Sequence, residues 1–212
     1  VMVGERLGFK DEKIFRGSLD ETAEVMFSSP NCLILQKTQR EIDKTPKRLG
    51  LKESDIRHSR GLITKDEVRA AVLHKLCLPV KGVFWDVGAG SGSISIEAAR
   101  LNPALEIFSI ERKEQEIVNI KYNAHAFGCK NIQVIEGAAP EILSQLPTPD
   151  CVFIGGSGGR LDDIIDYIDR HTGCEKLVMT AVTDKTAKEA PKYLLKRNFV
   201  VQKSTISVTR CT

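Results

Sequence analysis

Residues 83–93 decide the fold of this chain: Val83-Phe84-Trp85-Asp86-Val87-Gly88-Ala89-Gly90-Ser91-Gly92-Ser93. An apolar run ends in an acidic residue, and three glycines then alternate with small residues before a helix predicted to begin near Ser93. Glycine tolerates the backbone conformations that a tight turn between a strand and a helix requires. Such a turn lets the backbone approach a nucleotide-like ligand at the helix N-terminus. An ordinary glycine-rich turn without a ligand remains the alternative.

The spacing of the glycines separates two classes of nucleotide-binding turn. A dinucleotide-binding turn needs Gly-x-Gly-x-x-Gly, and this chain has Ser93 where the last glycine would stand. The sequence therefore disfavours a nicotinamide-dependent reductase. The observed Gly-x-Gly-x-Gly resembles the first motif of the class I methyltransferases that use S-adenosyl-L-methionine (SAM). This resemblance implies a SAM-binding turn made by Asp86, Gly88, Ala89, Gly90, Ser91 and Gly92.

Two further strand ends support a nucleotide-like ligand. A strand predicted at 105–110 ends at Glu111, about 20 positions beyond the glycine turn, where an acidic residue of such a sheet reaches a ribose hydroxyl pair. Another strand at 131–135 is followed by Ala138 and Ala139, whose small side chains leave room for an adenine. A plain turn before Pro140 is the alternative for the second site.

Strands and helices alternate regularly over the larger part of the chain. Helical periodicity is present over Leu62–Leu78. This alternation predicts an α/β, Rossmann-like fold: a mostly parallel sheet with helices on both faces and ligands at the carboxyl ends of the strands. Strands are expected near 83–87, 105–110, 131–135, 150–154, 175–180 and 199–208, and helices near 92–101, 113–127, 139–145, 160–171 and 184–197.

Composition excludes several classes of protein. Hydrophobic residues make up 42% and charged residues 28% of the chain, typical of a soluble globular protein. No apolar run has the length of a membrane span, and a net charge of +3 does not argue for nucleic acid. Six cysteines and four histidines are scattered singly, so we expect reduced thiols, a cytoplasmic protein and no metal site.

The two ends of the sequence differ from the central part. Residues 1–36 contain a predicted short helix at Leu19–Met26 and a strand at Asn31–Gln36, too little to bury a core. Residues 37–60 are dense in charge and are interpreted as a solvated linker. The sequence stops at Thr212, directly after the strand predicted near 199–208, so the closing hairpin of a class I methyltransferase is incomplete, and we expect a fragment of a longer protein.

The loop after the fourth predicted strand discriminates between methyltransferases. Nucleic-acid adenine or cytosine methyltransferases carry Asn/Asp-Pro-Pro-Tyr/Phe there, whereas this chain has Gly155-Gly156-Ser157-Gly158-Gly159. Bare backbone N–H groups and the lack of side chains leave space for a bulky ligand. A flexible turn leading to a helix near Arg160 is the alternative.

Four motifs in order resemble one family, the decarboxylating precorrin-6B or cobalt-precorrin-6B methyltransferases of cobalamin biosynthesis. The resemblance covers about residues 58–212 and rests on residues 61–69, 86–92, 136–140 and 155–159. Residues 1–36 resemble the end of a precorrin C5-methyltransferase of the tetrapyrrole methylase fold, which some organisms fuse ahead of this enzyme. The resemblance thus implies a methylase remnant at 1–36, a linker at 37–60 and a SAM methyltransferase domain at 61–212.

The resemblance also implies roles for individual residues. Thr64 would contact SAM, Glu111 the ribose and Ala139 the adenine, although family members often have an acidic residue at position 138. The tetrapyrrole would lie against Gly155, Gly156, Ser157, Gly158, Gly159 and Arg160, with Lys65 and Lys185 as further cations for its carboxylates. C15 would be methylated and the ring C acetate decarboxylated. No catalytic residue is assigned.

Related enzymes form tetramers, so the resemblance implies a homo-oligomer that binds neither nucleic acid nor membrane. Two other functions stay open from the sequence alone. A SAM-dependent RNA methyltransferase would need stacking aromatics near the site, but the single tryptophan, Trp85, lies in a predicted buried strand. The second open function is that of a non-catalytic fragment that binds SAM.

Overall fold

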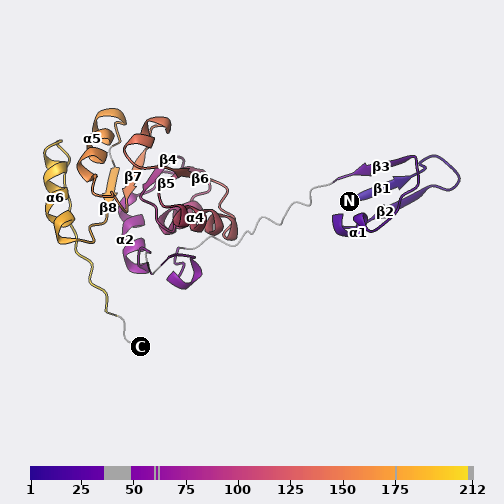
Figure 1. The fold of residues 1–212 in the computed structure, drawn as a ribbon, viewed down its shortest axis with the longest axis horizontal. Coiled ribbons are helices and arrows are strands. Elements are labelled where there is room, and N and C mark those ends of the chain that lie inside the picture. Colours follow the sequence, from indigo (N-terminus) through magenta and orange to yellow (C-terminus); the bar gives the residue numbers. More distant parts are fainter. Residues whose placement is uncertain (36–48, 60, 62, 175, 210–212) are drawn as a thin grey trace. The chain divides into compact units, whose positions relative to one another are not determined.

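The computed structural model describes residues 1–35, 49–59, 61, 63–174 and 176–209, which divide between two compact units, Val1–Pro46 and Lys47–Thr212 (Figure 1). The first unit is an antiparallel sheet in the order β2-β1-β3 with one short helix. Val3 is its one buried hydrophobic residue within the described range, so this unit lacks a core of its own. Its elements are β1 (Met2–Glu5), β2 (Lys13–Arg16), α1 (Leu19–Ala23) and β3 (Asn31–Ile34).

A five-stranded parallel sheet forms the centre of the second unit, in the order β6-β5-β4-β7-β8. The chain runs outward from β4 through β5 to β6 and then returns to the other side of β4 at β7. The strand order therefore reverses between β4 and β7, and such a switch point is where open α/β sheets bind ligands. The strands are β4 (Gly82–Val87), β5 (Leu105–Glu111), β6 (Ile132–Glu136), β7 (Cys151–Ile154) and β8 (Lys176–Met179).

Helices cover both faces of this sheet, as the alternating pattern predicted (Figure 1). One face carries α2 (Asp66–Leu76), α3 (Ser93–Leu101) and α4 (Glu114–Ala126). The opposite face carries η2 (Glu141–Gln145), α5 (Leu161–His171) and α6 (Asp184–Leu195). The predicted helix at 139–145 is thus a short 3₁₀ helix.

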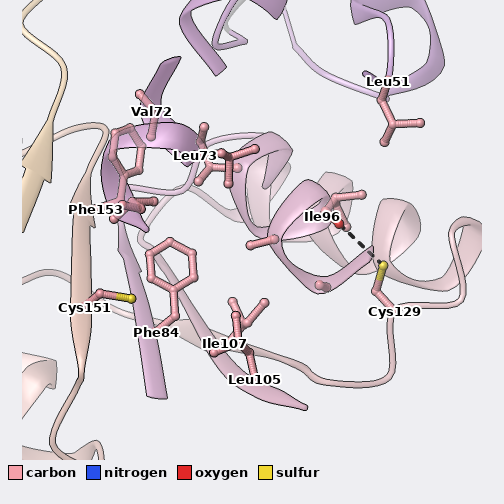
Figure 2. Packing of buried hydrophobic residues seen from close by; sticks show 14 of the residues in the cluster. Leu51, Val72, Leu73, Phe84, Ile96, Leu105, Ile107, Cys129, Cys151 and Phe153 are labelled. Atoms are coloured by element: carbon pink, nitrogen blue, oxygen red, sulfur yellow. Dashed lines mark hydrogen bonds between the residues drawn. The ribbon is translucent and has the colours of Figure 1, made fainter. Parts of the chain in front are cut away.

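Successive residues of β4 supply the two halves of the core because side chains alternate across a strand. Phe84 packs with Leu73, Ile96 and Phe153 beneath α2 and α3 (Figure 2). Trp85 points to the other face and is only 1% exposed, as predicted. Its burial removes it as a platform for stacking bases.

The prediction of a strand at 199–208 is wrong. Residues 199–209 form neither strand nor helix, and Val200 is fully exposed. The run of β-branched residues favours an extended backbone, but a strand also needs a hydrogen-bonded neighbour. Within the described residues, β8 pairs with β7 alone, so this segment adds no sixth strand.

The interpretation of 37–60 as a solvated linker is wrong for its second half; residues 36–48 and 60 lie outside the described residues. Residues 49–59, which we name the strap, include the 3₁₀ helix η1 (Glu53–Asp55). They belong to the second unit and pack on its helices and sheet. Leu51 and Ile56 are 8% and 2% exposed and belong to the core beneath α2 and α3. Two apolar anchors among many charges therefore draw this segment onto the sheet domain, and the second unit begins well before residue 61.

Candidate active site

The carboxyl ends of the central strands bring the predicted site residues together. In the parallel register, the last residue of β4, Val87, lies beside Ile110 of β5 on one side and Ile154 of β7 on the other. Glu111 and the Gly155–Gly159 loop follow directly after these two residues. The glycine turn, the acidic strand end and the glycine loop therefore meet at the switch point of the sheet.

The glycine turn uses the conformational freedom of all three glycines: φ is +69° at Gly88, +57° at Gly90 and +76° at Gly92. The N–H groups of Gly88 and Ala89 donate to the carbonyl oxygen of Ile110 at 2.9 and 3.1 Å, which fixes the turn on the end of β5. A Cβ placed on Gly90 would meet no heavy atom within 4 Å. The backbone at Gly90 thus faces open space that a ligand can enter.

The loop after β7 is pressed against this turn. A Cβ placed on Gly88 would lie 2.2 Å from the carbonyl oxygen of Gly156, so only glycine fits at position 88. The N–H groups of Gly155 and Gly156 donate to the carbonyl oxygen of Val87 at 2.9 and 3.3 Å. The predicted cofactor turn and the predicted substrate loop are therefore one continuous backbone surface.

Glu111 is fixed beside the turn by three main-chain donors. Its Oε2 accepts the N–H of Gly90 at 2.9 Å, and its Oε1 accepts the N–H groups of Arg112 and Lys113 at 2.9 and 3.0 Å. The residue is only 8% exposed. A carboxylate offers about four lone-pair positions, so Oε2 retains one for a hydroxyl donor.

Asp86 precedes the turn near the end of β4, and it is buried, being only 1% exposed. Its Oδ2 accepts hydrogen bonds from the Ser95 N–H at 3.2 Å and the Ser95 hydroxyl at 2.6 Å, and Ser109 donates to the Ser95 hydroxyl at 2.6 Å. Burial raises the pKa of Asp86 to about 7, although the bonds from Ser95 oppose this shift. Its Oδ1 has no hydrogen-bond partner within the described part of the chain.

We expect the stability of the protein to fall as pH rises through the range in which Asp86 ionises. Its pKa is about 7 in the folded protein, whereas an unperturbed aspartate has a pKa of 3.8, so the folded state binds more protons between these values. Stability from this group is therefore present at low pH and is lost as pH approaches 7. Urea unfolding should show wild type losing about 3 kcal/mol relative to Asp86→Asn between pH 4.5 and 8. A pH-independent difference would contradict a raised pKa.

The residues predicted at the adenine follow the end of β6. The Gly137 N–H donates to the carbonyl oxygen of Glu111 at 2.9 Å, which joins this strand end to the acidic one. Ala138 is exposed, and Ala139 is half-buried against the core on the α5 face. Their contact with an adenine stays a prediction.

Two of the three cations predicted to bind substrate carboxylates form ion pairs within the protein. Arg160 pairs with Glu141 and Asp163, and Lys65 pairs with Glu53 at 2.6 Å. Lys185 is exposed near the start of α6. The sequence interpretation missed a different cation.

Arg112 directly follows Glu111 and is exposed. A Cβ placed on Gly158 would come within 3.2 Å of its guanidinium, so this side chain reaches across to the glycine loop. No carboxylate pairs with Arg112 among the residues that the structure describes.

A small pocket opens on the other side of the glycine loop, towards β8 and α6. Its polar lining consists of backbone and hydroxyl groups rather than charged side chains. The lining residues are Ile154, Gly155, Gly156, Ser157, Leu161, Met179, Thr180, Val182, Thr183 and Thr186. The loop predicted to face the substrate therefore borders a hollow.

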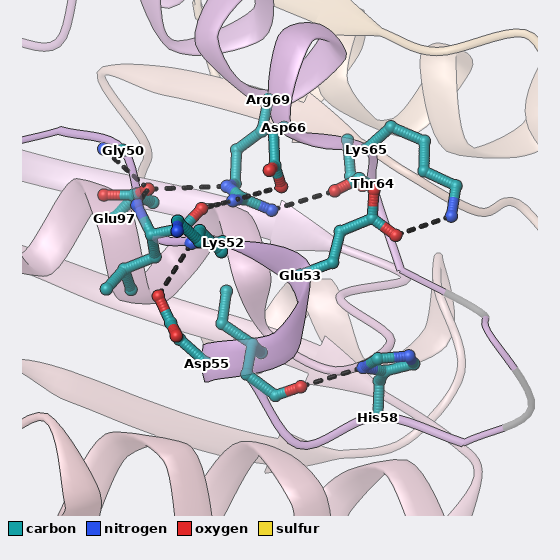
Figure 3. A network of polar contacts seen from close by, with 12 residues as sticks. Gly50, Lys52, Glu53, Asp55, His58, Thr64, Lys65, Asp66, Arg69 and Glu97 are labelled. Atoms are coloured by element: carbon teal, nitrogen blue, oxygen red, sulfur yellow. Dashed lines mark hydrogen bonds and ion pairs between the residues drawn. The ribbon is translucent and has the colours of Figure 1, made fainter. Parts of the chain in front are cut away.

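The strap and Thr64 are held by a buried arginine (Figure 3). Arg69 of α2 is only 1% exposed; it donates to the carbonyl oxygens of Thr64, at 2.9 Å, and Leu51, and lies 3.4 Å from Glu97. Glu97 in turn accepts the N–H groups of Gly50 and Leu51 at 3.1 and 2.7 Å. The residue predicted to contact SAM is therefore positioned through its main chain.

Other features bear on what the site can bind. Within the described residues, no cluster of three His, Cys, Asp or Glu side chains could hold a metal ion. No described helix is long and apolar enough to cross a membrane. Three cysteines are buried and two are exposed; Cys211 lies outside the described residues.

Residues 55–198 match the model of a family described as the precorrin methyltransferase domain. Two curated relatives are similar in sequence. A Sinorhizobium precorrin-6Y C(5,15)-methyltransferase (decarboxylating) is 43% identical over 125 residues, which are 58% of this chain and 30% of that protein. A Salmonella typhi cobalt-precorrin-6B C(15)-methyltransferase (decarboxylating) is 39% identical over 134 residues, 63% of this chain and 69% of that protein.

A solved structure is similar in both sequence and fold. The crystal structure of a precorrin-6Y C5,15-methyltransferase from Geobacter metallireducens superposes with a TM-score of 0.68 and 45% identity, covering 70% of this chain and 80% of that one. The chain thus spans most of that structure but less than a third of the Sinorhizobium protein.

Proposed function

This chain belongs to the precorrin methyltransferase domain family, and we propose that its second unit is a SAM-dependent methyltransferase acting on a corrin precursor. The substrate is precorrin-6B or its cobalt form. The methyl group goes to C15 of the macrocycle, and the ring C acetate loses CO2, as a step of cobalamin biosynthesis. The names of the relatives supply the methylation at C15 and the decarboxylation, and the resemblance supplies the ring C acetate and the pathway.

The strongest support for this proposal is that the glycine turn and the glycine loop share a backbone surface at the switch point of the sheet. Both lie inside the segment that matches the family model. Gly88 approaches Gly156 closely, so the turn and the loop lie side by side, which supports a shared site. A cofactor on the turn and a macrocycle on the loop would thus be neighbours, and methyl transfer depends above all on such alignment.

The residues at the turn fit SAM, which supplies a methyl group on a positively charged sulfonium when bound. Gly88–Gly92 would hold its methionine part, because the backbone at Gly90 faces open space. The remaining lone pair of Glu111 Oε2 would accept a ribose hydroxyl. Thr64 would also contact the cofactor, with its main chain fixed by Arg69.

The glycine loop and Arg112 fit the substrate side. Glycine removes side chains where a flat macrocycle would lie. Arg112 reaches this loop without a carboxylate partner among the described residues, whereas Arg160 is paired. A guanidinium is suited to bind a carboxylate with two hydrogen bonds, so we assign Arg112 ahead of Arg160 to the acidic side chains of the tetrapyrrole.

Glu111→Gln should weaken S-adenosylhomocysteine binding by about 10–100-fold, because it removes a charged acceptor and turns an NH2 group towards the Gly90 N–H. Isothermal titration calorimetry measures this change. Glu106→Gln is the matched control, since Glu106 is an exposed residue of the same strand. Equal affinity in both variants would contradict the role of Glu111.

The reaction is tested by mass spectrometry of precorrin-6B, with and without cobalt, after incubation with the protein and SAM. We expect a gain of one methyl group and a loss of CO2 in one of the two substrates. Glu111→Gln under subsaturating SAM serves as the slow control. An unchanged substrate, with S-adenosylhomocysteine binding intact in wild type, would reject the corrinoid and leave an RNA substrate or a non-catalytic SAM-binding role.

The first unit carries a separate proposal. This unit buries Val3 but exposes Phe9, Ile14 and Leu33 by more than half, and a sheet this small is marginal alone. From the resemblance, we propose that residues 1–36 belong to a tetrapyrrole methylase domain that would methylate C5. Assembly of the methyltransferase as a homo-oligomer is a further prediction from the resemblance.

A further inference from the structure

The strap is connected to the glycine turn through one side chain, Asn123 of α4. This residue is only 1% exposed. Its Oδ1 accepts the Arg57 N–H at 2.9 Å, and its Nδ2 donates to the Arg57 carbonyl oxygen at 2.9 Å and to the Ser91 carbonyl oxygen at 2.9 Å. The amide orientation is unambiguous, since an N–H requires the oxygen and two carbonyls require the NH2 group.

The bond to Ser91 acts where the backbone has the most freedom. Ser91 is flanked by Gly90 and Gly92, both with positive φ, and glycine loses more conformational entropy on ordering than other residues. Ser91 itself is 2% exposed. A buried donor that satisfies its carbonyl therefore favours one conformation of the turn.

The other polar anchors of the strap do not reach the turn. Glu97 accepts the Gly50 and Leu51 N–H groups, and Asn119 donates to the Ser59 hydroxyl at 3.0 Å. Asn119 is also 1% exposed and lies one helical turn before Asn123 on the same face of α4. Asn119 also donates to Glu116 within α4, whereas Asn123 contacts both the strap and the turn.

We propose that Asn123 is a positioning residue for the cofactor, coupling the docked strap to the glycine turn, so that the strap belongs to the cofactor site. This inference rests on the proposed use of SAM. Asn123 touches no reacting atom; it acts through Ser91 by holding the turn in the conformation that receives the ligand. Loss of the coupling costs affinity because ligand binding must then order the turn.

The test compares Asn123→Ala with Asn119→Ala in the whole chain. Calorimetry gives the S-adenosylhomocysteine affinity, thermal unfolding gives the stability, and hydrogen exchange reports residues 57–59 and 88–92. We expect Asn123→Ala to lower affinity about tenfold and to speed exchange in both segments. Asn119→Ala should lose stability but keep its affinity within about twofold, with faster exchange in the strap alone.

A purely structural role for Asn123 would give a different pattern. The two variants would then share the same affinity, and exchange at 88–92 would match wild type; this result overturns the proposal. Failure of wild type to bind S-adenosylhomocysteine would instead reject the proposed function. Should Asn123→Ala fail to fold, Asn123→Asp replaces it, because the carboxylate keeps the acceptor for Arg57 but lacks both donors.

Discussion

Gly88→Ala is expected to abolish S-adenosylhomocysteine binding and to cost the second unit about 3–5 kcal/mol of unfolding free energy. The added methyl group would lie 2.2 Å from the carbonyl oxygen of Gly156 and 2.7 Å from its nitrogen. Both neighbours are main-chain atoms of Gly156, whose N–H donates to the carbonyl oxygen of Val87 at the end of β4, so this residue cannot move without separating the turn from the loop. The substitution should therefore disrupt the cofactor side and the substrate side of the site together.

Gly128→Ala is the matched control for this variant. Gly128 has a φ of +63°, close to the +69° of Gly88, but a Cβ there meets no heavy atom within 4 Å. Backbone strain should cost both variants about 1–2 kcal/mol, and only Gly88→Ala adds the clash. Calorimetric titration and urea unfolding of the two variants separate the effects. Intact binding by Gly88→Ala would show that the turn and loop are not rigidly joined.

Local features of the sequence were enough to predict the glycine turn. Alternating glycines after an apolar run permit the positive φ of a tight turn, and the structure has it at Gly88, Gly90 and Gly92. The parallel sheet was predictable too, since strand and helix periodicities alternate and parallel strands bring Glu111 and Gly155 to the same edge. These inferences need only short-range pattern and the geometry of parallel sheets.

The errors concern contacts between residues distant in sequence. The segment 199–208 has the residue types of a strand, but only pairing makes a strand, and pairing is not encoded locally. The strap was interpreted as solvated because charges outnumber its two anchors, Leu51 and Ile56. The hydrogen bonds of Asn123 to Arg57 and Ser91 span 66 and 32 positions in the sequence, so no rule based on residue spacing predicts them.

One missed residue did leave a signal in the sequence. Arg69 shares the 3.6-residue stripe of Val72, Leu73 and Leu76, the buried face of α2. A charged residue within a buried stripe requires a partner of opposite charge. Asp66, three positions earlier in α2, is a partly exposed partner, but the buried partner, Glu97, lies 28 positions away in α3, and only the fold identifies it.

Breaking this buried pair should cost the second unit about as much stability as Gly88→Ala. Arg69→Met would leave the buried Glu97 with Arg100 as its remaining ion-pair partner and would free the Thr64 and Leu51 carbonyl oxygens, so we expect a loss of about 3–5 kcal/mol. Glu97→Gln keeps an oxygen for the Gly50 and Leu51 N–H groups but leaves the buried Arg69 charge with the partly exposed Asp66 as its remaining ion-pair partner. We expect it to cost about 2–4 kcal/mol.

The double variant Arg69→Met/Glu97→Gln decides whether the charges act as a pair. It leaves no unpaired buried charge, so its loss should be smaller than the sum of the single losses by at least about 1 kcal/mol. Arg170→Met is the control: its ion pair with Asp166 is at the surface, with the arginine 68% exposed, and should contribute less than about 1 kcal/mol. Urea unfolding measures all four variants. Additive losses would mean that Arg69 stabilises the strap through its bonds to main-chain carbonyls alone, with Glu97 acting independently on Gly50 and Leu51.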